Sequence, residues 1–379
     1  MKIASWRKSL GDQVRAVHGT LDIGKSPVPD RIYITSLFTY RWQEVRKAAL
    51  FYRNLYPDAE LFLGGIYASL MPDHARTQVG IEPHVGILEE TEPFPPDYET
   101  FKGWPGSSSS YVYTTRGCPR KCKFCGSRKI FPAFITIDDW MSHIDLLKDS
   151  VVVLDENITA APFDHFESVM RQLSELSRDI LFCNGFDCRL ITADHARLMA
   201  KARMPQIRLA FDTIRQDGHI QRAIDCLAKA GIHKRHLLVY ILYNFKDDME
   251  DAMYRATEMH KLGVRVYPMR YKPLDWLDPK NMFVDPNWEK QDVIDFYNYW
   301  KSFVAPHRFT FDEWRSTGKN WTHSNRRKKL MGRTSERRTS KKILTEPFDN
   351  LISKLKKDPQ SIFNDNVFVK ECFGEKGFE

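Results

Sequence analysis

Six short apolar segments, separated by helix-forming stretches, occupy the middle of the chain. They are rich in β-branched and aromatic residues, which favour strands, and the stretches between them place apolar residues at helical spacing. The segments read SYVYTT, SVVVLD, ILFCNG, IRLAFD, HLLVYIL and VRVYPMRY. Such alternation predicts a parallel sheet covered by helices, and six units are typical of a partial (β/α) barrel. We therefore expect an α/β fold with its chemistry at the carboxyl ends of the strands.

The rest of the chain divides by composition around this region, and 379 residues suit about two domains and an appendage. Residues 1–92 show a shorter strand and helix alternation, and residues 93–110 are rich in Pro, Gly and Ser, as linkers are. The six-strand region takes up residues 111–285. Residues 286–379 predict a mostly helical, basic extension that includes the helical patterns NWEKQDVIDFYNYWKSFV and FDNLISKLKKD.

The positive charge is concentrated near the end of the chain. The whole chain carries a formal net charge of +8, whereas residues 301–357 hold 16 Lys and Arg against five Asp and Glu. With Trp321, His323 and Asn325 interleaved, this run could neutralise phosphates, which makes a nucleic-acid partner one expectation. A solvated charge run that keeps the protein soluble is the other.

Cellular context is indicated by what the sequence lacks. It has no run of 18 apolar residues, and its start, MKIASWRKSLGDQV, is not a continuous apolar signal, so we expect no membrane partner. The seven cysteines are odd in number and mostly scattered. Without a signal segment this argues for reduced thiols, and we expect a cytoplasmic protein.

Three cysteines are the exception to that scatter. Cys118, Cys122 and Cys125 follow the first strand with the spacing C-x3-C-x2-C in RGCPRKCKFCG. Closely spaced thiolates select zinc or an iron-sulfur cluster. A structural zinc site needs a fourth ligand, and the candidates His74, His84 and Cys183 are distant in sequence. Three thiolates can instead hold three irons of a [4Fe-4S] cube and leave the fourth iron open.

This cysteine motif resembles that of the radical S-adenosylmethionine (SAM) superfamily. The aromatic Phe124 stands directly before the third cysteine, and the first expected barrel strand precedes the whole motif. The resemblance implies a [4Fe-4S] cluster whose open iron binds SAM. It also implies an electron donor, such as flavodoxin or ferredoxin, and cleavage of SAM to a 5′-deoxyadenosyl radical that abstracts hydrogen from a substrate. In such proteins the cofactors supply the chemistry, and the chain supplies orientation and shielding.

The amino-terminal segment carries a second resemblance. GGIYASLMPDHA and LEETEPFPPDYETF are similar to the cobalamin-binding-type domain and linker that precede the barrel in one subgroup. This implies a shortened Rossmann-like domain. The D-x-H-x-x-G motif of base-off cobalamin domains is absent, because His18 has Ala16 where the aspartate would stand. The resemblance leaves cobalamin binding open.

The resemblance to the superfamily also implies that SAM lies across the strand ends. Phe124 would lie near its adenine, with a place in the core as the alternative. At the end of the second strand, Asp155, Glu156 and Asn157 are candidates to hold the SAM amino group, because a carboxylate and an ammonium form a charge-assisted hydrogen bond. Helix capping is their alternative.

Later strand ends add weaker candidates. Asn184 and Gly185 would allow close approach of the backbone, and Arg189 could pair with the SAM carboxylate, with a turn and a surface salt bridge as alternatives. Asp212 stands where related proteins show an acidic residue. The turn after the fifth strand has Tyr243 and Asn244 in place of the usual glycine. Further weak candidates, for SAM or for substrate, are Arg270 and Tyr271.

Two function classes therefore stay open. The first is a radical SAM enzyme of unspecified substrate. The second is a non-catalytic, zinc-bearing, nucleic-acid-binding protein that uses the same cysteines and the basic run. Cys183 and Cys188 are expected to be buried free cysteines that pack as small apolar residues.

Overall fold

The computed structural model describes residues 1–22, 27–302 and 305–316, which form two compact units. Unit 1 consists of residues 1–107 and 274–280, and unit 2 consists of residues 108–273 and the described residues from 281 onward. Strands and helices alternate in both units, which confirms the α/β class. The expected closing helix at 348–358 and most of the basic run lie outside the described residues.

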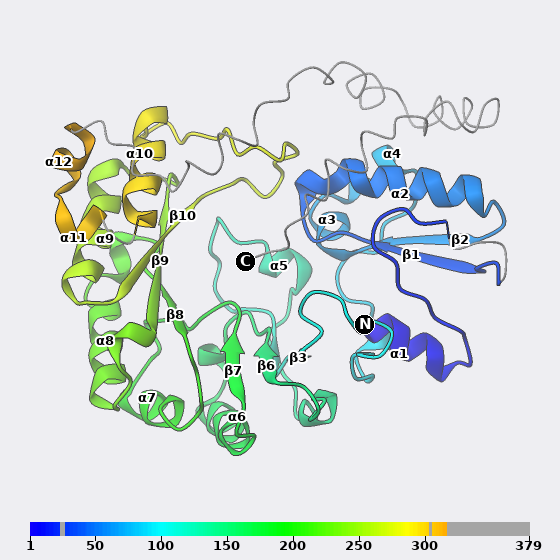
Figure 1. Ribbon diagram of the computed structural model, residues 1–379, viewed down its shortest axis with the longest axis horizontal. Helices are drawn as coiled ribbons and strands as arrows, with labels where there is room; N and C mark the ends of the chain where they lie inside the picture. The colour runs from blue at the N-terminus through cyan, green and yellow to red at the C-terminus, as the bar shows by residue number, and fades with distance from the viewer. Residues whose placement is uncertain (23–26, 303–304, 317–379) are drawn as a thin grey trace. The chain divides into compact units, whose positions relative to one another are not determined.

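Unit 1 is built on a short parallel sheet. Strands β1 and β2 pair in parallel, with Ile34 opposite Leu63. Figure 1 shows α2 and α4 together on one side of this sheet. The elements of the unit are α1 (Lys2–Ser9), β1 (Arg31–Thr35), η1 (Thr39–Arg41), α2 (Trp42–Leu55), β2 (Glu60–Gly64), α3 (Gly65–Leu70), α4 (Pro72–Val79) and η2 (Glu89–Thr91).

A segment from much later in the chain completes unit 1. Leu277 packs against the core cluster that contains Leu63 and Tyr67, both of which are almost fully buried. The Thr39 hydroxyl donates a hydrogen bond to the Trp276 carbonyl oxygen at 3.1 Å. Residues 274–280 are therefore part of this unit's packing although they follow the last strand of unit 2.

Unit 2 contains all six expected strands. They form two three-stranded parallel sheets, in the orders β3-β6-β7 and β8-β9-β10, and an isolated bridge joins Phe186 to Leu209 between β7 and β8. The strands are β3 (Ser109–Val112), β6 (Ser150–Val153), β7 (Asp179–Phe182), β8 (Ile207–Ala210), β9 (Leu237–Tyr243) and β10 (Arg265–Arg270). A short antiparallel pair, β4 (Thr115–Arg116) and β5 (Ile135–Thr136), follows β3.

Helices α6 to α9 lie along the outer side of the curved row of strands (Figure 1). Alternate residues of the strands, among them Val153 and Leu209, pack with helix residues such as Phe166 in one core. The helices of unit 2 are α5 (Ser127–Ile130), η3 (Met141–His143), η4 (Ile158–Ala160), α6 (Phe163–Glu175), α7 (Ala193–Met199), η5 (Ile214–Gln216), α8 (His219–Lys229), η6 (Lys234–His236), α9 (Met249–Lys261), α10 (Lys290–Lys301), α11 (Ala305–Arg308) and α12 (Phe311–Ser316).

A buried arginine fastens α9 to the ends of two strands. The Arg255 side chain is fully buried, and its Nη1 donates to the carbonyl oxygens of Phe211 and Leu242, both at 2.8 Å. Its Nη2 pairs with Asp247 at 2.5 Å and its Nε pairs with Asp251 at 2.6 Å. The carboxyl ends of β8 and β9 are thereby held at one place on α9.

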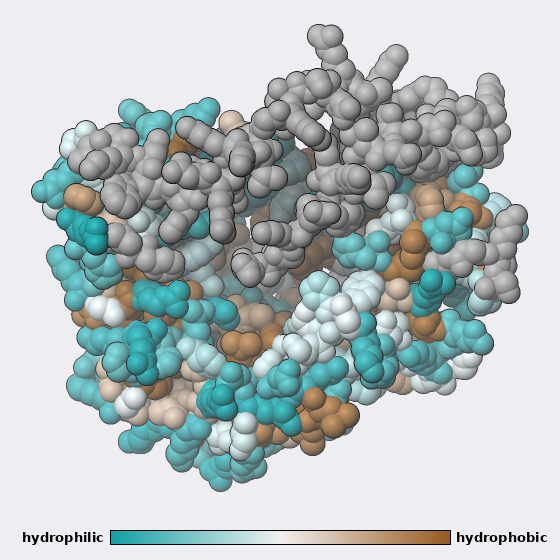
Figure 2. Space-filling view, in the orientation of Figure 1, coloured by the Kyte–Doolittle hydropathy of each residue, from teal (hydrophilic) through white to brown (hydrophobic). Residues whose placement is uncertain are grey.

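The visible surface is mainly hydrophilic, with hydrophobic residues in separate patches (Figure 2). In the part of the chain that the structure describes, no helix combines the length and the apolar character needed to cross a membrane.

Candidate metal and cofactor site

The three motif cysteines lie on one loop that leaves β4 and ends at α5. The loop starts at Gly117, whose φ of +80° is in the left-handed region. A Cβ at this position would lie 2.1 Å from the Ala133 carbonyl oxygen, so only glycine fits. Cys118 and Cys122 are partly buried and Cys125 is exposed.

Two acidic residues from the end of β6 hold the backbone that leads into this loop. Asp155 is buried and accepts hydrogen bonds from the Thr114 N–H at 2.7 Å, from the Thr114 hydroxyl and from the Thr115 hydroxyl at 2.9 Å. Glu156 accepts a bond from the Gly117 N–H at 2.8 Å, and burial raises its pKa to about 7. Both carboxylates accept hydrogen bonds from the residues that lead into the cysteine loop. Helix capping, the alternative role for them, is therefore wrong.

Asn157 contacts the cysteine loop directly. Its Nδ2 donates to the Cys118 sulfur at 3.5 Å, and its Oδ1 accepts from the Thr159 hydroxyl at 2.7 Å. Although Asn157 precedes η4, its side chain makes no capping hydrogen bond. Its contact is with a predicted metal ligand.

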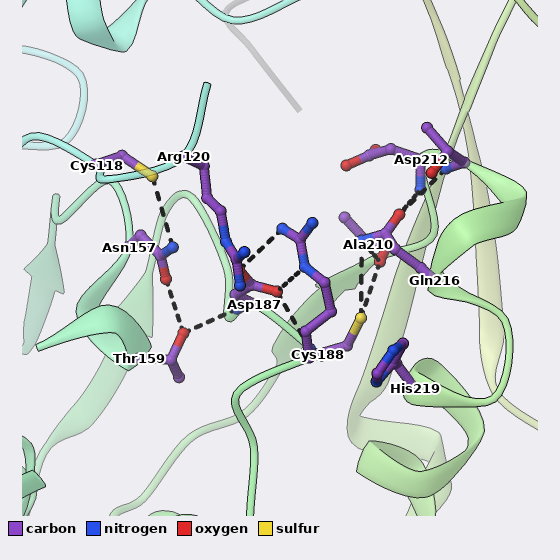
Figure 3. Close-up of polar contacts among 12 residues, drawn as sticks. Cys118, Arg120, Asn157, Thr159, Asp187, Cys188, Ala210, Asp212, Gln216 and His219 are labelled. Atoms are coloured by element: carbon purple, nitrogen blue, oxygen red, sulfur yellow. Dashed lines mark hydrogen bonds and ion pairs between the residues drawn. The ribbon is translucent and has the colours of Figure 1, made fainter. Parts of the chain in front are cut away.

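A charged cluster follows the end of β7. Asp187, whose side chain is 4% exposed, pairs with Arg189 through two bonds of 2.7 and 2.9 Å. It also pairs with Arg120 of the cysteine loop at 2.9 Å (Figure 3). Burial alone would raise the Asp187 pKa, but the hydrogen bonds and charges of the two arginines bring it below its ordinary value. Arg189 therefore forms a salt bridge, the structural alternative considered for it, although its partner Asp187 is buried.

Asp212 lies just beyond the end of β8. Burial raises its pKa to about 6, while Arg255 and Arg189 oppose the rise. The structure records no hydrogen bond to its carboxylate among the described residues; only its backbone N–H is used, by Gln216 Oε1 at 2.6 Å.

Electrostatic coupling places Asp212 and Arg189 near the middle cysteine. Burial raises the Cys122 pKa, the Arg189 charge opposes the rise, and the charges of Cys125, Asp212 and Cys118 add to it. The cysteine loop and the ends of β7 and β8 thus share one neighbourhood, as their positions at strand ends predict.

Asn184 supports the backbone in this neighbourhood. Its amide donates to the carbonyl oxygens of Leu154 at 2.9 Å and Asp155 at 3.1 Å. The next residue, Gly185, has a φ of +82°, and a Cβ there would lie 2.7 Å from the Arg208 carbonyl oxygen. The backbone at Gly185 therefore lies so close to the backbone of β8 that only glycine fits there.

Phe124 begins a row of aromatic rings at the ends of the last strands. It meets Phe245 edge-on with centroids 5.6 Å apart, Phe245 lies 4.4 Å from Tyr271, and Tyr271 lies 5.4 Å from Phe283. Arg270 donates to the Phe283 carbonyl oxygen at 2.7 Å, and its buried Nε has no hydrogen-bond partner in the part of the chain that the structure describes. The weak candidates Arg270 and Tyr271 thus lie in a mostly aromatic setting.

The donor chemistry of the loop fits a soft metal centre, because three thiols follow one another within eight residues. Within the described ranges, however, no three His, Cys, Asp or Glu side chains form a metal-ligand group. The zinc candidates His74 and His84 belong to unit 1, where their rings bond Tyr67 and the Ile87 carbonyl oxygen. Cys188 is buried as expected, but Cys183 is exposed, so that expectation is wrong for it.

Sequence reasoning missed several residues of this site: Thr114, Arg120, Thr159, Asp187 and Arg255. The signal that could have found Arg120 and Asp187 is their opposite charge at the ends of two strands in a predicted parallel sheet, where carboxyl ends meet. The threonines carry no comparable signal.

Comparisons with known proteins add little. No protein-family model matches the sequence, and no curated protein matches it. Among solved structures, methylornithine synthase (PylB) is similar with a TM-score of 0.35 and 14% sequence identity. The similarity covers 50% of this chain and 61% of that chain, and at this TM-score it supports no assignment of the site.

Proposed function

We propose that this protein is a radical SAM enzyme. The observation that carries the proposal is the C-x3-C-x2-C loop, which follows the first of six parallel strands and is joined through Arg120 to Asp187 beyond the end of β7. A loop of three soft ligands at the carboxyl edge of such strands suits a cluster with one open iron. Unit 2 would then be a partial (β/α)6 barrel whose two sheets join at the bridge between Phe186 and Leu209.

In this proposal Cys118, Cys122 and Cys125 hold a [4Fe-4S] cluster and leave one iron for SAM. When bound, the two cofactors would supply a radical that abstracts hydrogen from the substrate. The chain would position them. Phe124 and Phe245 offer aromatic rings for the adenine, and Asp212 offers the amino group a carboxylate that no described residue hydrogen-bonds.

The remaining candidates have internal partners. Asp155 holds the backbone that leads into the cysteine loop, Asn184 supports the backbone at the end of β6, and Asn157 contacts Cys118. Their contribution would be to shape the site. Arg189 would reach a SAM carboxylate only by sharing or leaving Asp187. We further propose that unit 1 is a shortened relative of cobalamin-binding-type domains. We assign no step to cobalamin, because the D-x-H-x-x-G motif is absent.

The test is anaerobic reconstitution with iron and sulfide, followed by reduction in the presence of SAM. We expect about four irons and four sulfides per chain, as for a [4Fe-4S] cluster, and formation of 5′-deoxyadenosine. Cys118→Ala should abolish both results. Cys226→Ala, which changes a partly buried cysteine of α8, should leave both unchanged.

Metal analysis of protein purified without oxygen separates this proposal from the zinc alternative. One zinc with neither iron nor sulfide, or unaltered 5′-deoxyadenosine formation in Cys118→Ala, would refute the radical SAM proposal. The basic run that motivates nucleic-acid binding lies mostly outside the described residues, so it gives the zinc alternative no structural support.

A further inference from the structure

Four residues other than the cysteines form a hydrogen-bonded circuit that starts and ends on the cysteine loop (Figure 3). From Cys118 it passes to Asn157 at 3.5 Å and on to Thr159 at 2.7 Å. The Thr159 oxygen accepts from the Asp187 N–H at 3.0 Å, and the Asp187 carboxylate pairs with Arg120 at 2.9 Å. Arg120 is two residues after Cys118, so the circuit closes.

The circuit has a fixed direction. A backbone N–H can only donate, so the Thr159 oxygen accepts from residue 187 and its own hydrogen is left for the Asn157 oxygen. With its oxygen engaged, Asn157 turns its NH₂ group toward the Cys118 sulfur. The sulfur therefore receives a donor, which is the polarity that a ligating thiolate accepts.

Asp187 anchors the circuit by charge. Its nearly buried carboxylate pairs with Arg189, which lies two residues later in the same segment after β7, and with Arg120 on the cysteine loop. Buried carboxylates need such partners, and charge-assisted bonds are about twice as strong as neutral ones. A single residue after β7 thus holds the loop between Cys118 and Cys122 through its carboxylate, and it orients Asn157 through its backbone N–H and Thr159.

We propose that Asp187 is a positioning residue for the cysteine site: through Arg120 it holds the loop in place, and through Thr159 and Asn157 it directs a hydrogen bond at the Cys118 sulfur. Its effect on a bound cluster rests on the proposed function. Its effect on the loop does not, and the two can be measured separately.

The first experiment uses metal-free, full-length protein and follows alkylation of individual cysteines by iodoacetamide with peptide mass spectrometry. In Asp187→Asn, Cys118 and Cys122 should react several-fold faster than in the wild type, because the loop opens more often, while Cys226 on α8 serves as the internal reference. The matched control is Asp179→Asn. Asp179 pairs with Arg203 at 2.6 Å at the start of the same strand, and its substitution should leave the Cys118 rate unchanged.

The second experiment tests the directed hydrogen bond in reconstituted protein by redox titration. Hydrogen bonds to ligating sulfur favour the reduced cluster, so Asn157→Ala should lower the reduction potential. Thr159→Val should lower it by less, because Asn157 remains but loses its orienting partner. Thr159→Ser, which keeps the hydroxyl, should restore the wild-type potential, a rescue that a merely structural role would not predict.

The outcomes are separable. Unchanged Cys118 alkylation in Asp187→Asn would overturn the positioning proposal even if the wild type binds a full cluster. Equal potentials in the wild type, Asn157→Ala and Thr159→Val would overturn its hydrogen-bonding part. Faster alkylation in Asp187→Asn together with a wild type that takes up no iron would support the positioning role while refuting the proposed function.

Discussion

At the scale of single residues, Gly117 meets two requirements at once. Its φ is positive, and the space where a Cβ would point is filled by the Ala133 carbonyl oxygen. Gly117→Ala should therefore destabilise the protein by roughly 3 kcal/mol or more, since left-handed strain alone costs about 1 to 2 kcal/mol and the backbone contact adds to it. Urea unfolding curves measure the change.

Gly103 provides the matched control for that substitution. Its φ of +79° is almost the same, but a Cβ there would meet no described atom within 4 Å. Gly103→Ala should show the conformational strain alone, about 1 to 2 kcal/mol. If the two variants lose equal stability, the contact with Ala133 has no energetic weight.

Asp212 gives a pH dependence with a defined sign. Its pKa is about 6 in the folded protein against an ordinary value of 3.8, so the folded state binds an extra proton between these values. Stability from this group is present below pH 3.8 and is lost as the pH rises through about 6. Asp212→Asn should therefore raise the free energy of unfolding at pH 8 by about 1 to 3 kcal/mol.

The same comparison at low pH is the internal check. At about pH 3 or below the two proteins should have nearly the same stability, because the wild-type carboxyl is then mostly protonated both folded and unfolded. Asp138→Asn, at an exposed position, should change stability little at either pH. A wild type more stable than Asp212→Asn at pH 8 would contradict the burial penalty.

The sequence predicted which residue types occur at the site better than it predicted which residues they bond. The cysteine spacing and the polar residues after strands were visible as local patterns. The pairings of Asp155 with Thr114, and of Asp187 with Arg120, span 41 and 67 residues, so no local pattern encodes them. They arise only when parallel strands bring their carboxyl ends together.

At the scale of elements, Arg255 joins α9 to two strands. Arg255→Met should destabilise unit 2 by about 3 to 5 kcal/mol, because it leaves the Asp247 carboxylate and two carbonyl oxygens buried without their donor. Thermal or urea unfolding measures this. Arg171→Met breaks an exposed pair with Glu167 on α6 and should cost about 0.5 kcal/mol or less. Similar losses in both variants would mean that burial of the Arg255 pair is unimportant.

The strands of unit 2 could be predicted from their β-branched and aromatic residues. The conformation of the turn after β9 could not. After β9 both Asn244 and Lys246 have positive φ, at 64° and 56°. Asn244 is held by its side-chain bonds to the Asp285 N–H and the Phe283 carbonyl oxygen. These partners lie about 40 residues later, so the sequence showed only that the expected glycine was missing.

At the scale of the whole molecule, unit 1 is discontinuous in sequence. Leu277→Ala should reduce amide protection from hydrogen exchange in β1, β2 and α3, at a cost of about 1 to 2 kcal/mol for a partly buried leucine, while β9 and α9 in unit 2 keep theirs. Leu147→Ala is the control, because that side chain is 92% exposed. Equal loss of protection in both units would show that they unfold together.

Because residues 274–280 pack in unit 1 but are synthesised late, they also determine when unit 1 can finish folding during synthesis. The bond from Thr39 to the Trp276 carbonyl oxygen spans 237 residues, so it cannot form until residues 108–273 of unit 2, with all six of its parallel strands, have left the ribosome. Domains generally fold as they emerge, amino-terminal part first. Here the part made first must wait for its last segment, so the nascent chain carries an unfinished unit 1 while the strands of unit 2 assemble.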